Sequence, residues 1–164
     1  MFNQWKKIAA TLSAAALLGM NAGITSAQEH SHAHHGEKPA KLTLDNGKKW
    51  ATDDNLRQGM EKIRDALEAE LPAVHSGKAT VEQYRALAEK IDDQIAFVVK
   101  NCRLDQKTDA TLHLVLADII AGTESMKAKS GSKARKGAEK IMRALDNYGA
   151  YFNHPGWHGI TPVH

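Results

Sequence analysis

Apolar residues recur at spacings of three and four along four stretches of the chain. The first three stretches cover residues 53–74, 81–103 and 109–127, and the fourth begins after residue 132 and ends near residue 152. This spacing places apolar side chains on one face of an α-helix, and no stretch alternates as a β-strand does. The pattern predicts an all-α protein of four amphipathic helices.

The apolar stripes of these helices give the predicted core, and the second stripe is the most regular because it keeps a heptad spacing over the whole helix. The stripes consist of Leu56, Met60, Ile63, Leu67, Leu71 and Val74; of Tyr84, Ala88, Ile91, Ile95, Val98 and Cys102; of Leu112, Val115, Leu116, Ile119, Ile120 and Met126; and of Ala138, Ile141, Met142, Leu145, Tyr148 and Phe152.

Polar residues predict where the helices begin. The Thr-Asp-Asp run at 52–54 supplies a cap and negative charge for the first helix. Thr80 and Gln83 have the spacing of a capping box, and Thr108 is the expected cap of the third helix. Pro72 is expected to loosen the last turn of the first helix.

Short connections at 75–80, 104–108 and 128–132 favour tight reversals between neighbouring helices. Four helices of about 20 residues joined in this way predict an antiparallel up-down-up-down four-helix bundle over residues 51–153. Residues 154–164 then form a C-terminal tail. The alternative is a homodimer whose long helices complete the bundle between two chains.

The first 27 residues have the features of a secretory signal peptide. Lys6 and Lys7 precede an apolar run at residues 8–20, and small residues stand at Thr25 and Ala27. The run is shorter than the roughly 20 residues that span a bilayer, so we expect cleavage and no stable membrane insertion afterwards. Removing the two lysines lowers the formal net charge from +3 to +1. The sequence therefore predicts a periplasmic protein.

Composition excludes several classes of protein. A chain of 164 residues fits a single ordinary domain. One cysteine excludes an internal disulfide framework, a Cys-x-x-Cys redox pair and haem attached through Cys-x-x-Cys-His. The small net charge, without a basic stripe interleaved with aromatics, argues against nucleic acid as a partner.

Catalytic motifs are missing from the sequence. None of the four predicted helices carries the Glu-x-x-His pair of the di-iron bundles, and the sequence has no His-Glu-x-x-His, no phosphate-binding glycine loop and no nucleophile elbow. Asp92 and Asp93 are adjacent, so their side chains diverge on a helix and do not form an acid/base pair. We therefore expect a protein that is not an enzyme.

Residues 28–50 are predicted to be a flexible arm, because they begin with a polar segment rich in histidine. Its four histidines are His30, His32, His34 and His35. Neutral imidazoles at this density on a mobile chain chelate Cu(II), Ni(II) or Zn(II). The alternative is a solvated tail without a role in metal binding.

A second set of metal ligands is expected at one pole of the bundle. In an antiparallel bundle this pole joins the starts of the first and third helices to the ends of the second and fourth. It would bring together Met60, Cys102 and His113, with His154 or His158 beside them. Thiolate, imidazole and thioether suit Cu(I), and Cu(II) or Zn(II) tolerate them. At the opposite pole we expect a single histidine, His75, which we interpret as a solvated loop residue.

Each of these residues also has a structural interpretation. Met60 fills the core as part of its stripe, and Cys102 is a buried inert thiol on a seam position. His113 adjoins the apolar face of its helix, where a hydrogen-bonded histidine would have no need of a metal. His154 and His158 would simply belong to the tail.

The layout over about residues 50–152, with Met60 early in the first helix, resembles the cytochrome b562 and cytochrome c-prime architecture. In the b-type family this resemblance implies haem held by a Met of the first helix and a His of the fourth. Here the fourth helix ends with Asn147, Tyr148 and Tyr151, and His113 would have to take the place of the histidine. The stretch 148–157 also resembles the ending of small uncharacterised exported bundle proteins of bacteria, which implies no activity.

We therefore predict a non-enzymatic exported protein that binds metal ions, copper above all, for capture or homeostasis in the periplasm. The first alternative is a b-type haem electron carrier of the cytochrome b562 type. The second is a stress-response or structural bundle that binds partner proteins, in which the arm plays no part.

Overall fold

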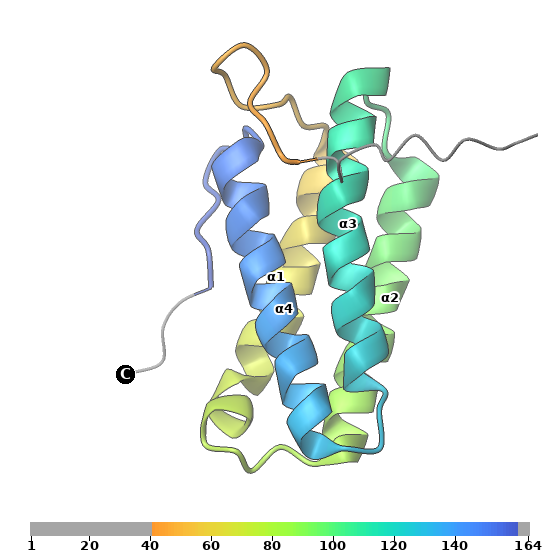
Figure 1. Ribbon diagram of the computed structural model, residues 1–164. Helices are drawn as coiled ribbons and strands as arrows, with labels where there is room; N and C mark the ends of the chain where they lie inside the picture. Colours follow the sequence, from red (N-terminus) through yellow and green to blue (C-terminus); the bar gives the residue numbers. More distant parts are fainter. Residues whose placement is uncertain (1–40, 161–164) are drawn as a thin grey trace, which may run out of the picture. The chain divides into compact units, whose positions relative to one another are not determined.

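The computed structural model describes residues 41–160, and this part of the chain forms a four-helix bundle (Figure 1). The helices are α1 (Asp54–His75), α2 (Val81–Asn101), α3 (Gln106–Met126) and α4 (Gly131–Tyr151). Residues 41–160 contain no strand, only two isolated bridges, Asp45–Lys48 and Trp50–Phe152. The predicted all-α class is confirmed. The predicted signal peptide and the four histidines of the arm lie outside the described residues.

The predicted starts of the first two helices are confirmed, whereas α4 begins at Gly131, inside the 130–132 stretch that was predicted to precede it. The Asp53 carboxylate caps α1 by accepting from the Leu56 N–H, and Ser130 caps α4. Thr80 and Gln83 form both bonds of the capping box at the start of α2. In each helix the cap satisfies an N–H group that has no acceptor within the helix.

The prediction for the third helix start is wrong. Asp105, and not Thr108, caps α3, and its carboxylate accepts from the N–H groups of Lys107 and Thr108. Thr108 is buried inside the first turn, where its hydroxyl donates to the same carboxylate. An ionised aspartate offers two acceptor oxygens and so satisfies more of the free donors than a threonine can.

The apolar stripes form one core, and three predicted positions depart from it. All six predicted core residues of α1 are buried. Ile120, predicted in the core, is 44% exposed, because it lies on the outer side of α3 next to buried Ile119. Met142 and Cys102 are only partly buried against the core. Leu87, Ala134 and Ala144 are buried although their positions fall beside the predicted stripes.

Two helix ends also differ from expectation. Pro72 is accommodated within α1, which continues to His75, and the Pro72 carbonyl accepts from the Ser76 N–H. α2 ends at Asn101, and Cys102 takes an extended backbone conformation (φ −58°, ψ 143°). His75 is thus an exposed residue of the last helical turn and not of the loop.

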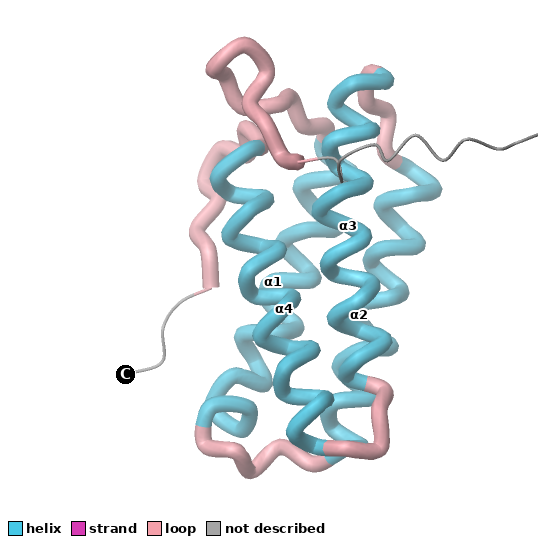
Figure 2. Tube along the Cα trace, in the orientation of Figure 1, coloured by secondary structure: helices cyan, strands magenta, loops and turns pink. Residues whose placement is uncertain are grey.

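The segment before α1 packs against the bundle. A tight turn at residues 45–48 leads to Trp50, whose N–H donates to the Tyr151 carbonyl (2.8 Å). The Asn153 N–H donates in return to the Trp50 carbonyl (2.8 Å). Leu42 and Trp50, which fall inside the predicted 28–50 arm, are partly buried against the core. Figure 2 shows this segment and the loops that join the helices.

None of the helices formed by residues 41–160 is long and apolar enough to cross a membrane.

Candidate functional site

Cys102 lies where α2 ends, close to the start of α1. Its thiol donates to Asp53 Oδ1 (3.4 Å), and the neighbouring Arg103 N–H donates to Asp53 Oδ2 (2.6 Å). Burial, with the negative charge and the acceptor bond of Asp53, raises the pKa of the Cys102 thiol to about 12. Cys102 is therefore a protonated thiol at neutral pH, hydrogen-bonded across two helices.

Asp53 serves both helices at once. Burial raises the pKa of its carboxyl, but the N–H bonds from Leu56 and Arg103 lower it more, and the net shift is downward. The ionised carboxylate thus caps α1 and also fixes the end of α2.

His113 stands on the second turn of α3 and is largely exposed, with 61% of its side chain accessible. Its Nδ1 lies 2.9 Å from the Asp109 carbonyl oxygen and 3.4 Å from Asp109 Oδ2. Both oxygens are acceptors, so Nδ1 carries the hydrogen. Nε2 has no hydrogen-bond partner among residues 41–160, which leaves its lone pair available in the neutral ring.

Cys102 and His113 line the same pocket, which has a volume of about 190 Å³. Asp109 is a third lining residue with a ligating side chain, and the remaining wall is apolar. Within residues 41–160, however, three or more His, Cys, Asp or Glu side chains are nowhere gathered closely enough to hold a metal ion. The pocket therefore offers one thiol from the end of α2 and one imidazole from α3, with a carboxylate nearby.

Met60, the thioether of the predicted ligand set, is placed differently. It is fully buried among the core residues of the bundle and is not among the residues that line the Cys102 pocket. Its structural interpretation, filling the core as part of the α1 stripe, accounts for this position.

His154 lies in the tail and is buried against α1 and α4. Its Nε2 is 3.0 Å from Glu61 Oε1, and its Nδ1 is 3.0 Å from the Tyr148 hydroxyl. A carboxylate accepts only, so Nε2–H donates to Glu61 and the Tyr148 O–H donates to Nδ1. Both ring nitrogens are thus engaged, and a metal ion could bind His154 only by breaking one of these bonds.

The surroundings of these hydrogen bonds favour the neutral forms of the His154 imidazole and the Tyr148 phenol. Burial lowers the pKa of His154 below its usual value, although the Glu61 carboxylate acts in the opposite direction. Burial also raises the pKa of the Tyr148 phenol far above its usual value. The set Glu61–His154–Tyr148 is therefore a fixed link between tail and helices at neutral pH.

Trp157 closes this cluster from outside. Its ring lies edge-on to Tyr148 at 4.8 Å between centroids, and the buried Arg64 guanidinium stands 5.2 Å from its ring. A Cβ on Gly149 would come 2.6 Å from Trp157 Nε1, so only glycine lets the indole lie this close to α4. The indole N–H is buried and has no hydrogen-bond partner within residues 41–160.

Of the remaining predicted ligands, only His158 belongs to the described residues, and it joins neither group. His158 is exposed, and its Nδ1 lies 3.2 Å from the Gly159 carbonyl oxygen. His30, His32, His34 and His35 lie outside the described residues. Of the predicted bundle ligands, Cys102 and His113 therefore line one pocket, and Met60, His154 and His158 are not among the residues that line it.

Sequence reasoning missed Asp53, Asp109 and Glu61 as partners of these residues. Asp53 was expected only as a helix cap, and Glu61 follows Met60 on the polar side of α1 with no motif to distinguish it. The Pro-Gly turn after His154 could have indicated that the tail reverses toward the bundle.

Comparison of the chain with models of protein families, with curated proteins and with solved structures finds no match.

Proposed function

We propose that this protein binds copper ions through Cys102 and His113 and has no catalytic activity of its own. The observation that carries the proposal is that Cys102, directly after the end of α2, and His113 of α3 line one pocket of about 190 Å³. Thiolate and imidazole together favour Cu(I), which accepts a low number of ligands. Asp109 lies beside them as a carboxylate that can bind or orient.

The tautomer of His113 supports this assignment. The Asp109 carbonyl holds Nδ1–H, so that Nε2 is the free nitrogen. Histidines that bind metals generally donate their second ring N–H to a carbonyl or carboxylate in this way, which fixes the ring and its tautomer.

Copper must compete with a proton and with Asp53 for the thiol. The Cys102 pKa of about 12 means that binding releases the thiol proton and breaks its bond to Asp53. Affinity should therefore rise with pH across the neutral range.

Export and the histidine-rich arm belong to the same proposal. We propose that residues 1–27 direct the chain to the periplasm and that His30, His32, His34 and His35 capture ions for the bundle. We expect the arm's site to be the weaker one for Cu(I), because it offers imidazoles without the thiolate that the Cys102 pocket adds.

We further propose an antiparallel up-down-up-down order for the helices. Hydrogen bonds between helix ends support it: the Asn55 amide donates to the Asn101 carbonyl, and Arg85 to the Lys127 carbonyl. The first links the start of α1 to the end of α2, and the second links the start of α2 to the end of α3.

The proposal is tested by titrating the purified protein with Cu(I) in the presence of a competing chelator. We expect two classes of site: a weak one lost on deleting residues 30–35, and a tighter one lost in Cys102→Ser and in His113→Ala. His75→Ala is the matched control, because it removes an exposed histidine outside the pocket.

Two results would contradict the proposal. One is that the arm-deleted protein does not compete with the chelator at all. The other is that Cys102→Ser and His113→Ala retain the tighter class. The haem alternative stays a prediction, and a sharp Soret band on adding haemin, lost in a Met60 variant, would favour it.

A further inference from the structure

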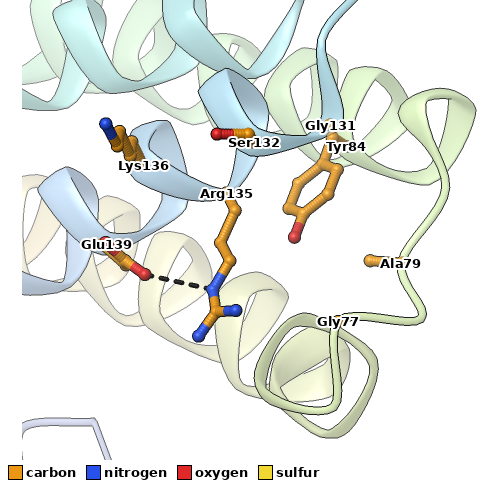
Figure 3. A pocket seen from close by; sticks show the side chains of 8 residues that line it. All are labelled: Gly77, Ala79, Tyr84, Gly131, Ser132, Arg135, Lys136 and Glu139. Atoms are coloured by element: carbon orange, nitrogen blue, oxygen red, sulfur yellow. Dashed lines mark hydrogen bonds and ion pairs between the residues drawn. The ribbon is translucent and has the colours of Figure 1, made fainter.

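A second pocket, of about 530 Å³, lies between the loop that follows α1 and the start of α4. Its walls include Tyr84 of α2, Ala79 of the loop, and Gly131, Ser132 and Arg135 of α4 (Figure 3). None of its lining residues belongs to the Cys102 pocket. It is therefore a separate feature of the bundle.

Tyr84 presents an unpartnered hydroxyl to this pocket. The residue is only 3% exposed, and its hydroxyl has no hydrogen-bond partner among residues 41–160. Figure 3 shows the hydroxyl pointing into the space beside Arg135 and Ala79. Burial raises the pKa of the phenol, so the group is an O–H donor at neutral pH. Most of the side chain is buried while the hydroxyl faces the open pocket, so the O–H is held in place where a ligand oxygen could accept from it instead of water.

The start of α4 supplies further donors. Ser130 uses its side chain to cap the Lys133 N–H and its carbonyl to accept from Ala134. The N–H groups of Gly131 and Ser132 have no acceptor among residues 41–160, as expected for the first turn of a helix. The dipole of this 21-residue helix favours a negative charge at the same point.

The charges around the pocket are positive on balance. Arg135 and Lys136 line it, and Glu139 is the lining acid, 3.1 Å from Arg135 Nε. Arg135 and Glu139 also border a smaller neighbouring pocket with His75. The ion pair neutralises Glu139 and leaves Lys136, while the free edge of the Arg135 guanidinium can still donate.

We propose that this pocket binds a small oxyanion, a phosphate or a carboxylate group, which accepts from the Tyr84 hydroxyl, the Arg135 guanidinium and the free N–H groups at the start of α4. Both ligand classes offer the same acceptor oxygens. A dianionic phosphate gains more from the two cations than a carboxylate does.

The test is a titration of the purified protein with inorganic phosphate and, separately, with acetate at constant ionic strength. Binding is followed by the amide NMR signals of Gly131 and Ser132. We expect saturable shifts of both signals in the millimolar range or below, with phosphate the tighter ligand. Acetate as the tighter ligand would identify the carboxylate class, and shifts with neither anion would overturn the proposal.

Variants distinguish anion binding in this pocket from nonspecific attraction of anions to basic side chains on the surface. Tyr84→Phe removes only the hydroxyl, and Arg135→Gln one cation; each should weaken binding about tenfold. Arg143→Gln is the matched control, because it removes an exposed arginine of the same helix outside the pocket. Equal weakening by Arg135→Gln and Arg143→Gln, or unchanged binding in Tyr84→Phe, would overturn the proposal, and the amide spectra report whether each variant is folded.

Discussion

At the scale of single residues, the chemical state of a side chain depends on the polar group that tertiary packing brings to it. The Cys102 thiol is kept protonated by burial and by Asp53. The His154 ring is kept neutral by burial despite its contact with Glu61. His113 keeps one nitrogen free because its other nitrogen is bonded within its own helix. The sequence alone presents these residues only as a thiol and two imidazoles.

Replacing Asp53 with asparagine should make Cys102 more reactive. Asparagine still caps α1 but removes the negative charge that opposes the thiolate, so the thiol pKa falls. A fall of one unit gives about ten times more thiolate at a fixed pH below the pKa. The rate of alkylation by iodoacetamide at mildly alkaline pH measures this. Asp54→Asn is the control, since Asp54 pairs with Arg57; equal rates in both variants would refute the prediction.

Acidification should destabilise the folded protein through His154. The unfolded state binds a proton on this residue below a pH of about 6.5, whereas the folded state binds it only at lower pH. Stability is thus complete above pH 6.5 and falls as the pH decreases toward the pKa of the folded state. Urea denaturation between pH 5 and pH 8 should show this slope reduced in His154→Gln; the same slope in both proteins would exclude His154 as the cause.

At the scale of the elements, local signals decide where each helix begins and ends. Small residues decide how closely two helices approach each other. α3 packs most extensively against α4. Gly122 and Gly137 face each other there: a Cβ on Gly137 would lie 2.5 Å from the Gly122 carbonyl oxygen. Real Cβ atoms essentially never come this close to another heavy atom, so the close approach of the two backbones requires glycine.

Gly137→Ala should therefore destabilise the bundle, by about 1–3 kcal/mol, the usual range for overpacking. Gly131→Ala is the matched control, because a Cβ there meets no atom within 4 Å. It should change the free energy of unfolding by about 0.5 kcal/mol or less. Chemical denaturation of both variants measures their free energies of unfolding. A Gly137→Ala protein as stable as the control would contradict the prediction, because α3 and α4 could then move apart at little cost in free energy.

At the scale of the whole molecule, the segments that flank the bundle connect helices distant in sequence. Trp50 pairs with the backbone at the end of α4, and His154 and Trp157 join α4 to Glu61 and Arg64 of α1. α1 has far less direct contact with α4 than with α2. We infer that the tail residues supply much of the attachment between α1 and α4.

Trp157→Ala should accordingly cost about 3 kcal/mol, the lower end of the usual range for a large aromatic, because Trp157 is only partly buried. Trp157→Phe should cost much less, since the indole N–H has no hydrogen-bond partner to lose within residues 41–160. Thermal unfolding of the two variants measures the difference. Equal destabilisation would show that the ring packing is not what holds the tail.

The sequence by itself determined the helices and most of the core. Periodicity and caps are local properties, readable within one or two turns, and they located α1, α2 and α4 closely; at α3 the nearby Asp105 outcompeted Thr108 for the cap. Tertiary structure alone decided which polar side chains meet. Cys102 bonds to a residue 49 positions away, and His154 to one 93 positions away. Such pairs depend on the rotation and axial offset of packed helices, which an apolar stripe leaves open because many apolar side chains fill a core equally well.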